Sequence, residues 1–207
     1  MKRTPDHTER RIIDEARRQF LKKGFEQTNM SDIARQLGIS RPKLHYYFRT
    51  KDMLFQAVFD GLVAHIIPPV HATLASPLPL FDKIERIADI YFRVFSRYPQ
   101  IPRFIVNETA RDLPHLLDAI HRAGIDDLLQ QARQLFDDEA DRGTIRRVSL
   151  PLIFTTFYSA IVFTFLSEKL VTRIFFRNKE EFRQFQDQWK RNIRQQMEAL
   201  LAPTPRP

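Results

Sequence analysis

Apolar residues recur at spacings of three and four along nearly the whole chain, and no stretch alternates apolar and polar residues as a half-buried strand would. Near the beginning, for example, Ile12, Ala16 and Phe20 follow this spacing. That period is typical of helices that bury one side. We therefore predict an all-α fold of about nine helices.

Residues 29–48 carry the most specific pattern, two short helices around a tight turn. Asn29 is a suitable helix N-cap with Asp32 three positions on, and apolar residues follow on one face at 30, 33, 34 and 37. Gly38 stands where a chain leaves a helix in the left-handed conformation. Ser40 can cap the next helix, and Pro42 is tolerated in its first turn. This arrangement predicts a helix-turn-helix, which reads DNA.

The second of these helices has one apolar face, made by Leu44, Tyr47 and Phe48. Its other face is basic and aromatic, as suits a recognition helix whose first residues reach base edges in the major groove. An ordinary solvated helix with chance positive charge is the alternative, and the glycine turn between paired caps argues against it. The outward set consists of Arg41 at the rim, Pro42, Lys43, His45 and Tyr46.

Residues 29–48, together with the first helix and the block LHYYFRTKDML at 44–54, resemble the TetR-like transcriptional repressors. The resemblance extends over about residues 8–66. The resemblance implies a C-terminal sensor domain, a homodimer and a palindromic operator in double-stranded DNA. It also implies phosphate contacts at Thr28 and Lys51. The DNA contacts that the resemblance implies are Thr28, Arg41, Lys43, His45, Tyr46 and Lys51.

One departure from the family concerns base recognition, because the family commonly has a small Gly-Thr pair where this chain has Pro42 and Lys43. A proline ring can contact a thymine methyl, and a lysine can donate to O6 or N7 of guanine. We therefore predict a half-site with G and T near the N-terminal end of the recognition helix.

The net charge of +8 is unevenly placed. Residues 1–55 hold 13 basic and 7 acidic residues, and residues 56–207 hold 20 and 18. Such asymmetry favours a local contact with phosphate over a protein that coats nucleic acid along its whole length. There is no cysteine, which excludes disulfides and thiolate metal sites within the chain and fits a reducing cytoplasm, where we expect the protein to act.

The stretch at 150–166 has no charged residue, yet it is short of the roughly 20 residues that a membrane span needs. We predict no membrane partner. The stretch is instead expected to be a helix buried between a ligand-binding core and a partner subunit.

We assign residues 1–50 to a helix-turn-helix DNA-binding domain and residues 51–207 to a C-terminal effector-binding and dimerisation domain, with a fourth helix at 51–67 linking them. Residues 67–79 are rich in proline and predict a connecting loop. The later helices are expected at 80–97, 101–111, 114–141 with a bend near Gly124, 149–168 and 178–201.

The last helix has an apolar stripe that needs a neighbour. Paired with the apolar helix before it, and with the same pair from a second copy, it would form a four-helix bundle across a two-fold axis. For Trp189, burial within one subunit is the alternative. The predicted interface residues are Phe157, Ile161, Phe165, Phe185, Trp189, Ile193 and Met197.

Aromatic residues on candidate inward faces, Phe157 and Phe163 among them, predict a roomy interior for a small-molecule effector, although plain core is the commoner role. Glu108 lies on the apolar face of its helix, so its carboxylate needs a partner. That partner is either a cationic or hydrogen-bond-donating effector, or an internal arginine such as Arg93 or Arg111. The predicted pocket residues are Phe92, Phe95, Phe104, Glu108, Phe154 and Tyr158.

No enzyme motif marks the chain, neither a glycine-rich phosphate loop, nor His-Glu-x-x-His, nor a nucleophile elbow. We expect no catalysis, no cofactor and no metal, since His115, Asp118 and His121 spread over too wide an arc of their helix for a joint site. The favoured hypothesis is a repressor released by an unidentified effector. The alternative is a constitutive architectural DNA-binding dimer without a ligand.

Overall fold

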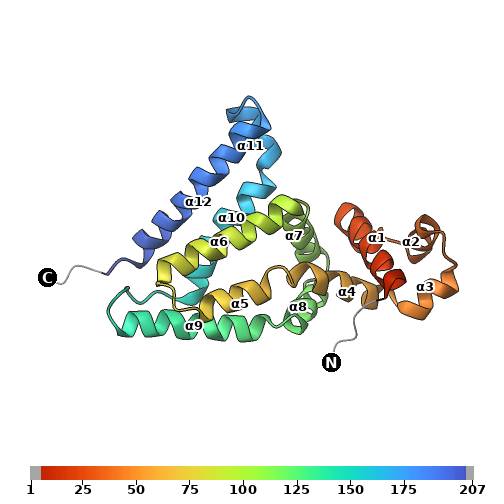
Figure 1. Ribbon diagram of the computed structural model, residues 1–207, viewed down its shortest axis with the longest axis horizontal. Helices are drawn as coiled ribbons and strands as arrows, with labels where there is room; N and C mark the ends of the chain where they lie inside the picture. Colours follow the sequence, from red (N-terminus) through yellow and green to blue (C-terminus); the bar gives the residue numbers. More distant parts are fainter. Residues whose placement is uncertain (1–5, 204–207) are drawn as a thin grey trace. The chain divides into compact units, whose positions relative to one another are not determined.

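The computed structural model describes residues 6–203, which form α-helices joined by short connections without any strand (Figure 1). The predicted all-α fold is confirmed. The outer ends of both predicted domains, residues 1–5 and 204–207, lie outside the described residues. The helices are α1 (His7–Lys23), α2 (Met30–Leu37), α3 (Arg41–Tyr47), α4 (Lys51–Val63), α5 (Ile67–Ala75), α6 (Leu80–Arg97), α7 (Ile101–Arg111), α8 (Leu113–Arg122), α9 (Ile125–Asp141), α10 (Leu150–Leu166), α11 (Glu168–Phe175) and α12 (Lys179–Leu201).

The prediction of about nine helices was too low, for three local reasons. Two prolines of the expected loop, Pro68 and Pro69, stand in the first turn of α5, where a missing N–H costs nothing. Gly124, with φ +91°, separates α8 from α9 instead of bending one long helix. A bend of 69° after α10 begins the short helix α11, which was not expected.

The chain packs as two compact units. The first contains the residues up to His65 together with Arg103–Ala123, and the second contains Ile66–Pro102 and the residues from Gly124 onward. Residues 51–65 therefore pack with the first unit. The functional division into residues 1–50 and 51–207 stays a prediction.

In the first unit, α1 packs against α2 and α4. Ile12, Phe20 and Phe55 are fully buried there or nearly so. The Phe25 ring, in the turn after α1, stacks on Phe20 with centroids 5.9 Å apart and meets Phe55 edge-on at 5.3 Å. These ring contacts join α1, the turn after it and α4 in one core.

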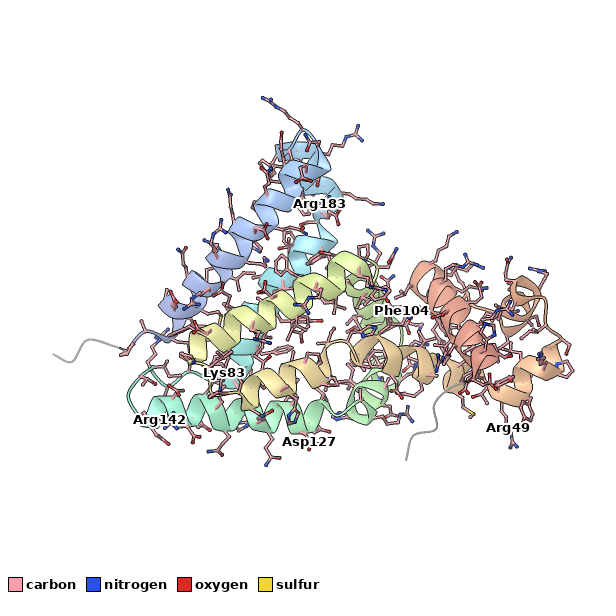
Figure 2. All side chains as sticks on the ribbon, in the orientation of Figure 1. Arg49, Lys83, Phe104, Asp127, Arg142 and Arg183 are labelled. Carbon is pink, nitrogen blue, oxygen red and sulfur yellow. The ribbon has the colours of Figure 1, made fainter. Side chains whose placement is uncertain are left out.

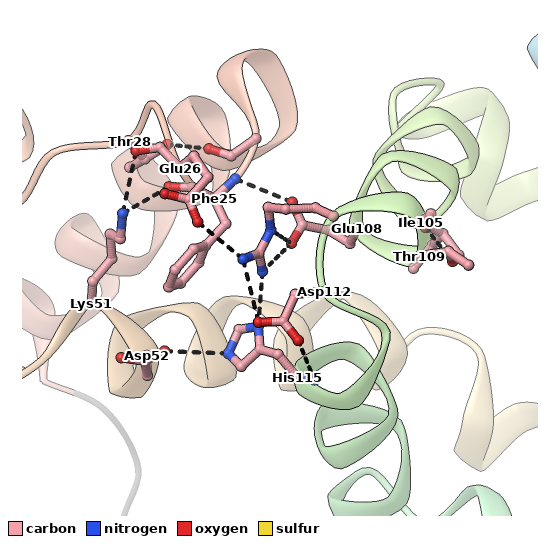
Figure 3. Close-up of polar contacts among 12 residues, drawn as sticks. Phe25, Glu26, Thr28, Lys51, Asp52, Ile105, Glu108, Thr109, Asp112 and His115 are labelled. Carbon is pink, nitrogen blue, oxygen red and sulfur yellow. Dashed lines mark hydrogen bonds and ion pairs between the residues drawn. The ribbon is translucent and has the colours of Figure 1, made fainter.

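A buried ion pair fastens α7 to the turn after α1 within this unit (Figure 3). Glu108 is 1% exposed, and its carboxylate accepts from the backbone N–H of Phe25 at 3.2 Å and from Arg111 Nε at 2.8 Å. The Arg111 guanidinium lies 4.5 Å from the Phe25 ring centroid and reaches Glu26 at 3.2 Å. A buried carboxylate requires such partners, because its desolvation is otherwise uncompensated.

In the second unit, α6 is the central helix and packs against α5, α10 and α12, while α5 also packs on α9. Phe92 and Phe95 of α6 both meet Phe165 of α10 edge-on, with centroids 5.3 and 5.4 Å apart. Arg194 of α12 also pairs with Asp82 and Glu85 of α6. Apolar and ionic contacts thus fix α6 between its neighbours.

By length and composition alone, one helical run among the described residues, Lys51–Ala75, is long and apolar enough to cross a membrane. A second would require α10 and α11 to be taken as one span despite their 69° bend. The α4 part of the first run buries Leu54, Phe55 and Phe59, as a helix in a protein core does.

Replacing Glu108 by glutamine should destabilise the protein by about 3 kcal/mol, because it leaves the partly buried Arg111 without its main counter-charge. The matched control is Glu26→Gln, which removes an exposed carboxylate from the same arginine and should cost no more than about 1 kcal/mol. Urea unfolding followed by circular dichroism measures both. Equal losses for the two variants would contradict the role given to the buried pair.

Candidate nucleic-acid interface and internal cavity

The turn between α2 and α3 has the predicted construction. The Asn29 side chain accepts from the Ser31 N–H at 2.8 Å, Gly38 is left-handed with φ +64°, and the Ser40 hydroxyl accepts from the Lys43 N–H at 3.3 Å. Asp32, which was expected to pair with Asn29 in this cap, instead forms an ion pair with Arg35 at 2.6 Å. The two caps and the glycine turn that define the helix-turn-helix are confirmed.

The short helix α3 presents one exposed face. Leu44 and Phe48 are buried, and the half-buried Tyr47 donates its hydroxyl to Asp6 at 3.0 Å. These anchors turn the remaining side chains to solvent, and Tyr46 is 81% exposed. The structure therefore brings together four of the predicted DNA-contacting residues, which are Arg41, Pro42, Lys43 and Tyr46.

His45 is partly buried and contacts Arg41. Its Nε2 accepts from Arg41 Nε at 3.3 Å, and its Nδ1 lies 3.1 Å from the carbonyl oxygen of Arg49. Both contacts are satisfied at once by a neutral ring that carries its proton on Nδ1. In this state His45 orients Arg41.

Thr28 and Lys51 do not lie on the α3 face. Thr28 is only 2% exposed and donates its hydroxyl to the Gly24 carbonyl at 2.8 Å, so the predicted phosphate contact through this side chain is corrected to an internal bond. Lys51 donates to the carbonyls of Phe25 at 3.0 Å and Glu26 at 3.3 Å (Figure 3). It remains partly exposed, and its phosphate contact stays a prediction.

The second unit contains a cavity of about 110 Å³, lined by residues of α5, α6, α9, α10 and α12. Its wall is almost wholly apolar. The exceptions are Lys83 and two tyrosines, Tyr91 of α6 and Tyr158 of α10, whose rings meet edge-on with centroids 5.7 Å apart. Removal from solvent raises the pKa of Tyr158 to about 12 and also raises the pKa of Tyr91, so both phenols stay protonated and neutral.

The predicted pocket residues divide between this cavity and other places. Phe154 and Tyr158 line it, and their rings stack with centroids 5.1 Å apart. Phe157, which was predicted for the dimer interface, lines the cavity as well. Phe92 and Phe95 were assigned wrongly, because they are held in the core by Phe165.

Phe104 and Glu108 were also assigned wrongly, since both belong to the first unit. Phe104 packs on Phe55 with ring centroids 5.7 Å apart. Glu108 is satisfied by Arg111, one of the two internal arginines considered as its partner.

Lys83 was missed by the sequence analysis although a signal was present. Its position, three residues after Leu80 and four before Ile87, places a cation on the inward face of α6. A charge within an apolar stripe marks either a buried ion pair or a ligand contact.

The predicted dimer residues also divide. Ile161, Phe165, Ile193 and Met197 are buried within the single chain, so their assignment to an interface is corrected. Because α10 is apolar on all sides, its periodicity does not tell the internal face from the outer one. The predicted interface residues Phe157, Phe185 and Trp189 are half-buried.

The outer face of α10 carries different residues from those predicted. Leu152 is 50% exposed, and Phe163, expected to face inward, is 67% exposed. Trp189 donates its indole N–H to the Ala160 carbonyl at 3.0 Å, which ties α12 to α10 within one chain.

Among residues 6–203, no three His, Asp or Glu side chains are placed to hold a metal ion. His115, considered for this role with Asp118 and His121, instead contacts Arg111 at 3.1 Å and Asp52 at 3.4 Å.

Comparison with known proteins agrees with this geometry. A sequence model described as "Bacterial regulatory proteins, tetR family" matches residues 12–58. Over 61 residues the chain is 36% identical to the HTH-type transcriptional regulator TtgR of Pseudomonas putida, covering 30% of this chain and 29% of TtgR. Over 109 residues it is 29% identical to the HTH-type transcriptional regulator RutR of Escherichia coli, covering 53% and 51%. The chain thus spans less than a third of the first relative and about half of the second.

The fold likeness extends over nearly the whole chain. The fatty acid degradation regulator FadR from Bacillus halodurans superimposes with a TM-score of 0.71 at 12% identity, covering 94% of this chain and 96% of that one. At this identity the likeness concerns the fold alone. The two sequence relatives are transcriptional regulators and not enzymes. Residues 12–58 thus match the tetR family of bacterial regulatory proteins in sequence, and the helical fold of nearly the whole chain matches that of a solved regulator in space.

Proposed function

We propose that this protein is a sequence-specific DNA-binding transcriptional regulator that represses from a palindromic operator, binds it as a homodimer and is released by a small-molecule effector. The observation that carries the proposal is the exposed face of α3, where Arg41, Pro42, Lys43 and Tyr46 gather on one side of a helix held by buried anchors. The proposed location is the cytoplasm, where duplex DNA is accessible.

The chemistry of that face suits duplex DNA. Arg41 and Lys43 stand in the first turn of α3, the part of a recognition helix that approaches base edges and phosphates. Tyr46 adds a flat, exposed ring with a hydroxyl that can bond to a phosphate or a base. The positive balance of residues 1–55 supplies sequence-independent attraction to the same surface.

A homodimer is supported by apolar residues that the single chain leaves uncovered on α10. Leu152 and Phe163 are eleven residues apart, which places them on one side of the helix. A second copy packing its α10 and α12 against the same helices would cover this side in a four-helix bundle. Two recognition helices related by that two-fold axis would read two half-sites one DNA turn apart.

The internal cavity supports the effector role. It is lined by helices of one unit and combines an apolar wall with a few polar groups, as small-molecule sites do. A ligand that binds one conformation of the dimer better than another shifts the equilibrium between DNA-bound and released forms.

Arg41→Ala should weaken binding to an inverted-repeat duplex and lower the slope of log K against log salt by about 1, because one phosphate contact is lost. Arg142→Ala, which removes an exposed arginine at the end of α9 (Figure 2), is the charge-matched control and should leave the slope unchanged. Fluorescence anisotropy at several salt concentrations measures both. The proposal fails if the two substitutions have the same effect.

The double change Pro42→Gly and Lys43→Thr should alter the preferred base pairs near the N-terminal end of α3, with a change of about 1–3 kcal/mol at the affected position. The physical reason is the loss of a thymine-methyl contact and a donor to guanine. Selection of binding sites from a random duplex pool reads the preference directly. An unchanged G and T preference would remove these two residues from base recognition.

Phe163→Glu should convert the dimer to a monomer and reduce affinity for the inverted repeat much more than affinity for a single half-site, since it places a charge in the proposed interface. Leu117→Glu on α8, also an exposed apolar position, is the control and should remain dimeric. Light scattering after size exclusion measures the mass. A Phe163→Glu protein that stays dimeric would contradict the α10 interface.

A further inference from the structure

Lys83 places a buried cation in the wall of the cavity. It lies on α6 (Figure 2), is only 7% exposed and donates from Nζ to the Leu74 carbonyl at 2.8 Å. Leu74 stands in the last turn of α5, where a positive charge is favourable. This contact explains why the ammonium points toward α5, and it occupies one of its three N–H groups.

No carboxylate of the described chain pairs with Lys83. The acidic residues of α6 are already engaged by α12, since Asp82 and Glu85 contact Arg194 and Asp89 contacts Lys190 at 3.0 Å. The cavity wall itself contributes no acidic group. An ammonium enclosed in this way has lost most of its hydration without gaining a counter-charge.

The same face of α6 lines an elongated apolar path that begins at Lys83. Ile87 and Tyr91 follow Lys83 at one and two turns, so the wall extends about 12 Å along the helix. Leu128 of α9 and Phe157 of α10 also line the cavity. Beside Tyr91 the neutral phenol of Tyr158 adds a donor without a charge.

We propose, building on the effector role proposed above, that the cavity binds an amphipathic monoanion. Its anionic head, a carboxylate or a similar small group, pairs with the free N–H groups of Lys83. Its unbranched or ring-bearing apolar body lies along α6 toward Tyr91 and Tyr158. A cationic ligand is repelled at the same point, and a neutral ligand leaves the buried ammonium without a counter-charge.

The test compares three probes of equal chain length, which are decanoate, 1-decanol and decylamine, on the full-length protein below their aggregation concentrations. Isothermal calorimetry should show decanoate bound at least 10-fold more tightly than decanol, and decylamine bound most weakly. Equal affinities for decanoate and decanol would overturn the proposal, as would the absence of binding by all three.

Two substitutions locate the effect at Lys83. Lys83→Met keeps the length of the side chain and should remove the preference for decanoate over decanol, whereas Lys83→Arg should retain it. Lys169→Met, which removes an exposed lysine of α11 outside the cavity, is the control and should keep the charge preference. If Lys83→Met does not fold, Lys83→Gln replaces it, and the probe selectivity of the parent protein decides in any case. A Lys83→Met protein that still prefers decanoate would contradict the assignment.

Operator binding, measured on the same preparations, separates this inference from the proposed function. If the parent protein binds an inverted repeat but does not discriminate between decanoate and decanol, the anion site alone is disproved. If it prefers decanoate yet binds no duplex, the regulator proposal fails and the anion site stands.

Discussion

The exposed face of α3, which we propose binds DNA, depends on one geometric constraint, the anchoring of a seven-residue helix at both ends. Gly38 supplies the left-handed conformation that starts the turn, and Ser40 caps the first turn of α3. Leu44 and Phe48 then fix the rotation of the helix by entering the core. With so few residues there is a single way to bury both anchors, and the face left to solvent is the basic and aromatic one.

Two buried charged residues differ in whether the chain itself compensates the cost of desolvating the charge. Glu108 has two partners, the guanidinium of Arg111, which also stacks on the Phe25 ring, and the backbone N–H of Phe25, so its charge is compensated within the chain. Lys83 is buried nearly as deeply but meets one carbonyl oxygen and an apolar cavity. The first arrangement stabilises the fold. In the second, an anion bound in the cavity would supply the counter-charge that Lys83 lacks, and this pairing favours binding.

The sequence predicted the all-α fold and the helix-turn-helix because their signals are local. Caps, a glycine turn and a three-to-four spacing act within one or two turns of chain, and they settle how Asn29, Gly38 and Ser40 behave. The same spacing predicted that Glu108 is buried. It could not predict which groups surround the carboxylate, because its partner Phe25 lies 83 residues away in the sequence.

Long-range packing also explains the errors on α10 and α5. A helix apolar on every side gives no sign of which face meets α6 and α12 and which remains open, so Phe165 was placed at an interface and Phe163 inside. Prolines in the first turn of α5 look like loop residues in the sequence. The helix forms because the residues that follow them pack against α6 and α9.

The central claim, two α3 helices presented one DNA turn apart by a symmetric dimer, is tested most directly by a distance between them. Because the chain has no cysteine, Arg49→Cys just after α3 introduces a single site for a spin label. Pulsed electron resonance of the labelled protein on an inverted-repeat duplex should give a narrow distribution near roughly 34–36 Å. Absence of a dipolar signal, or a broad distribution unaffected by the duplex, would contradict the account.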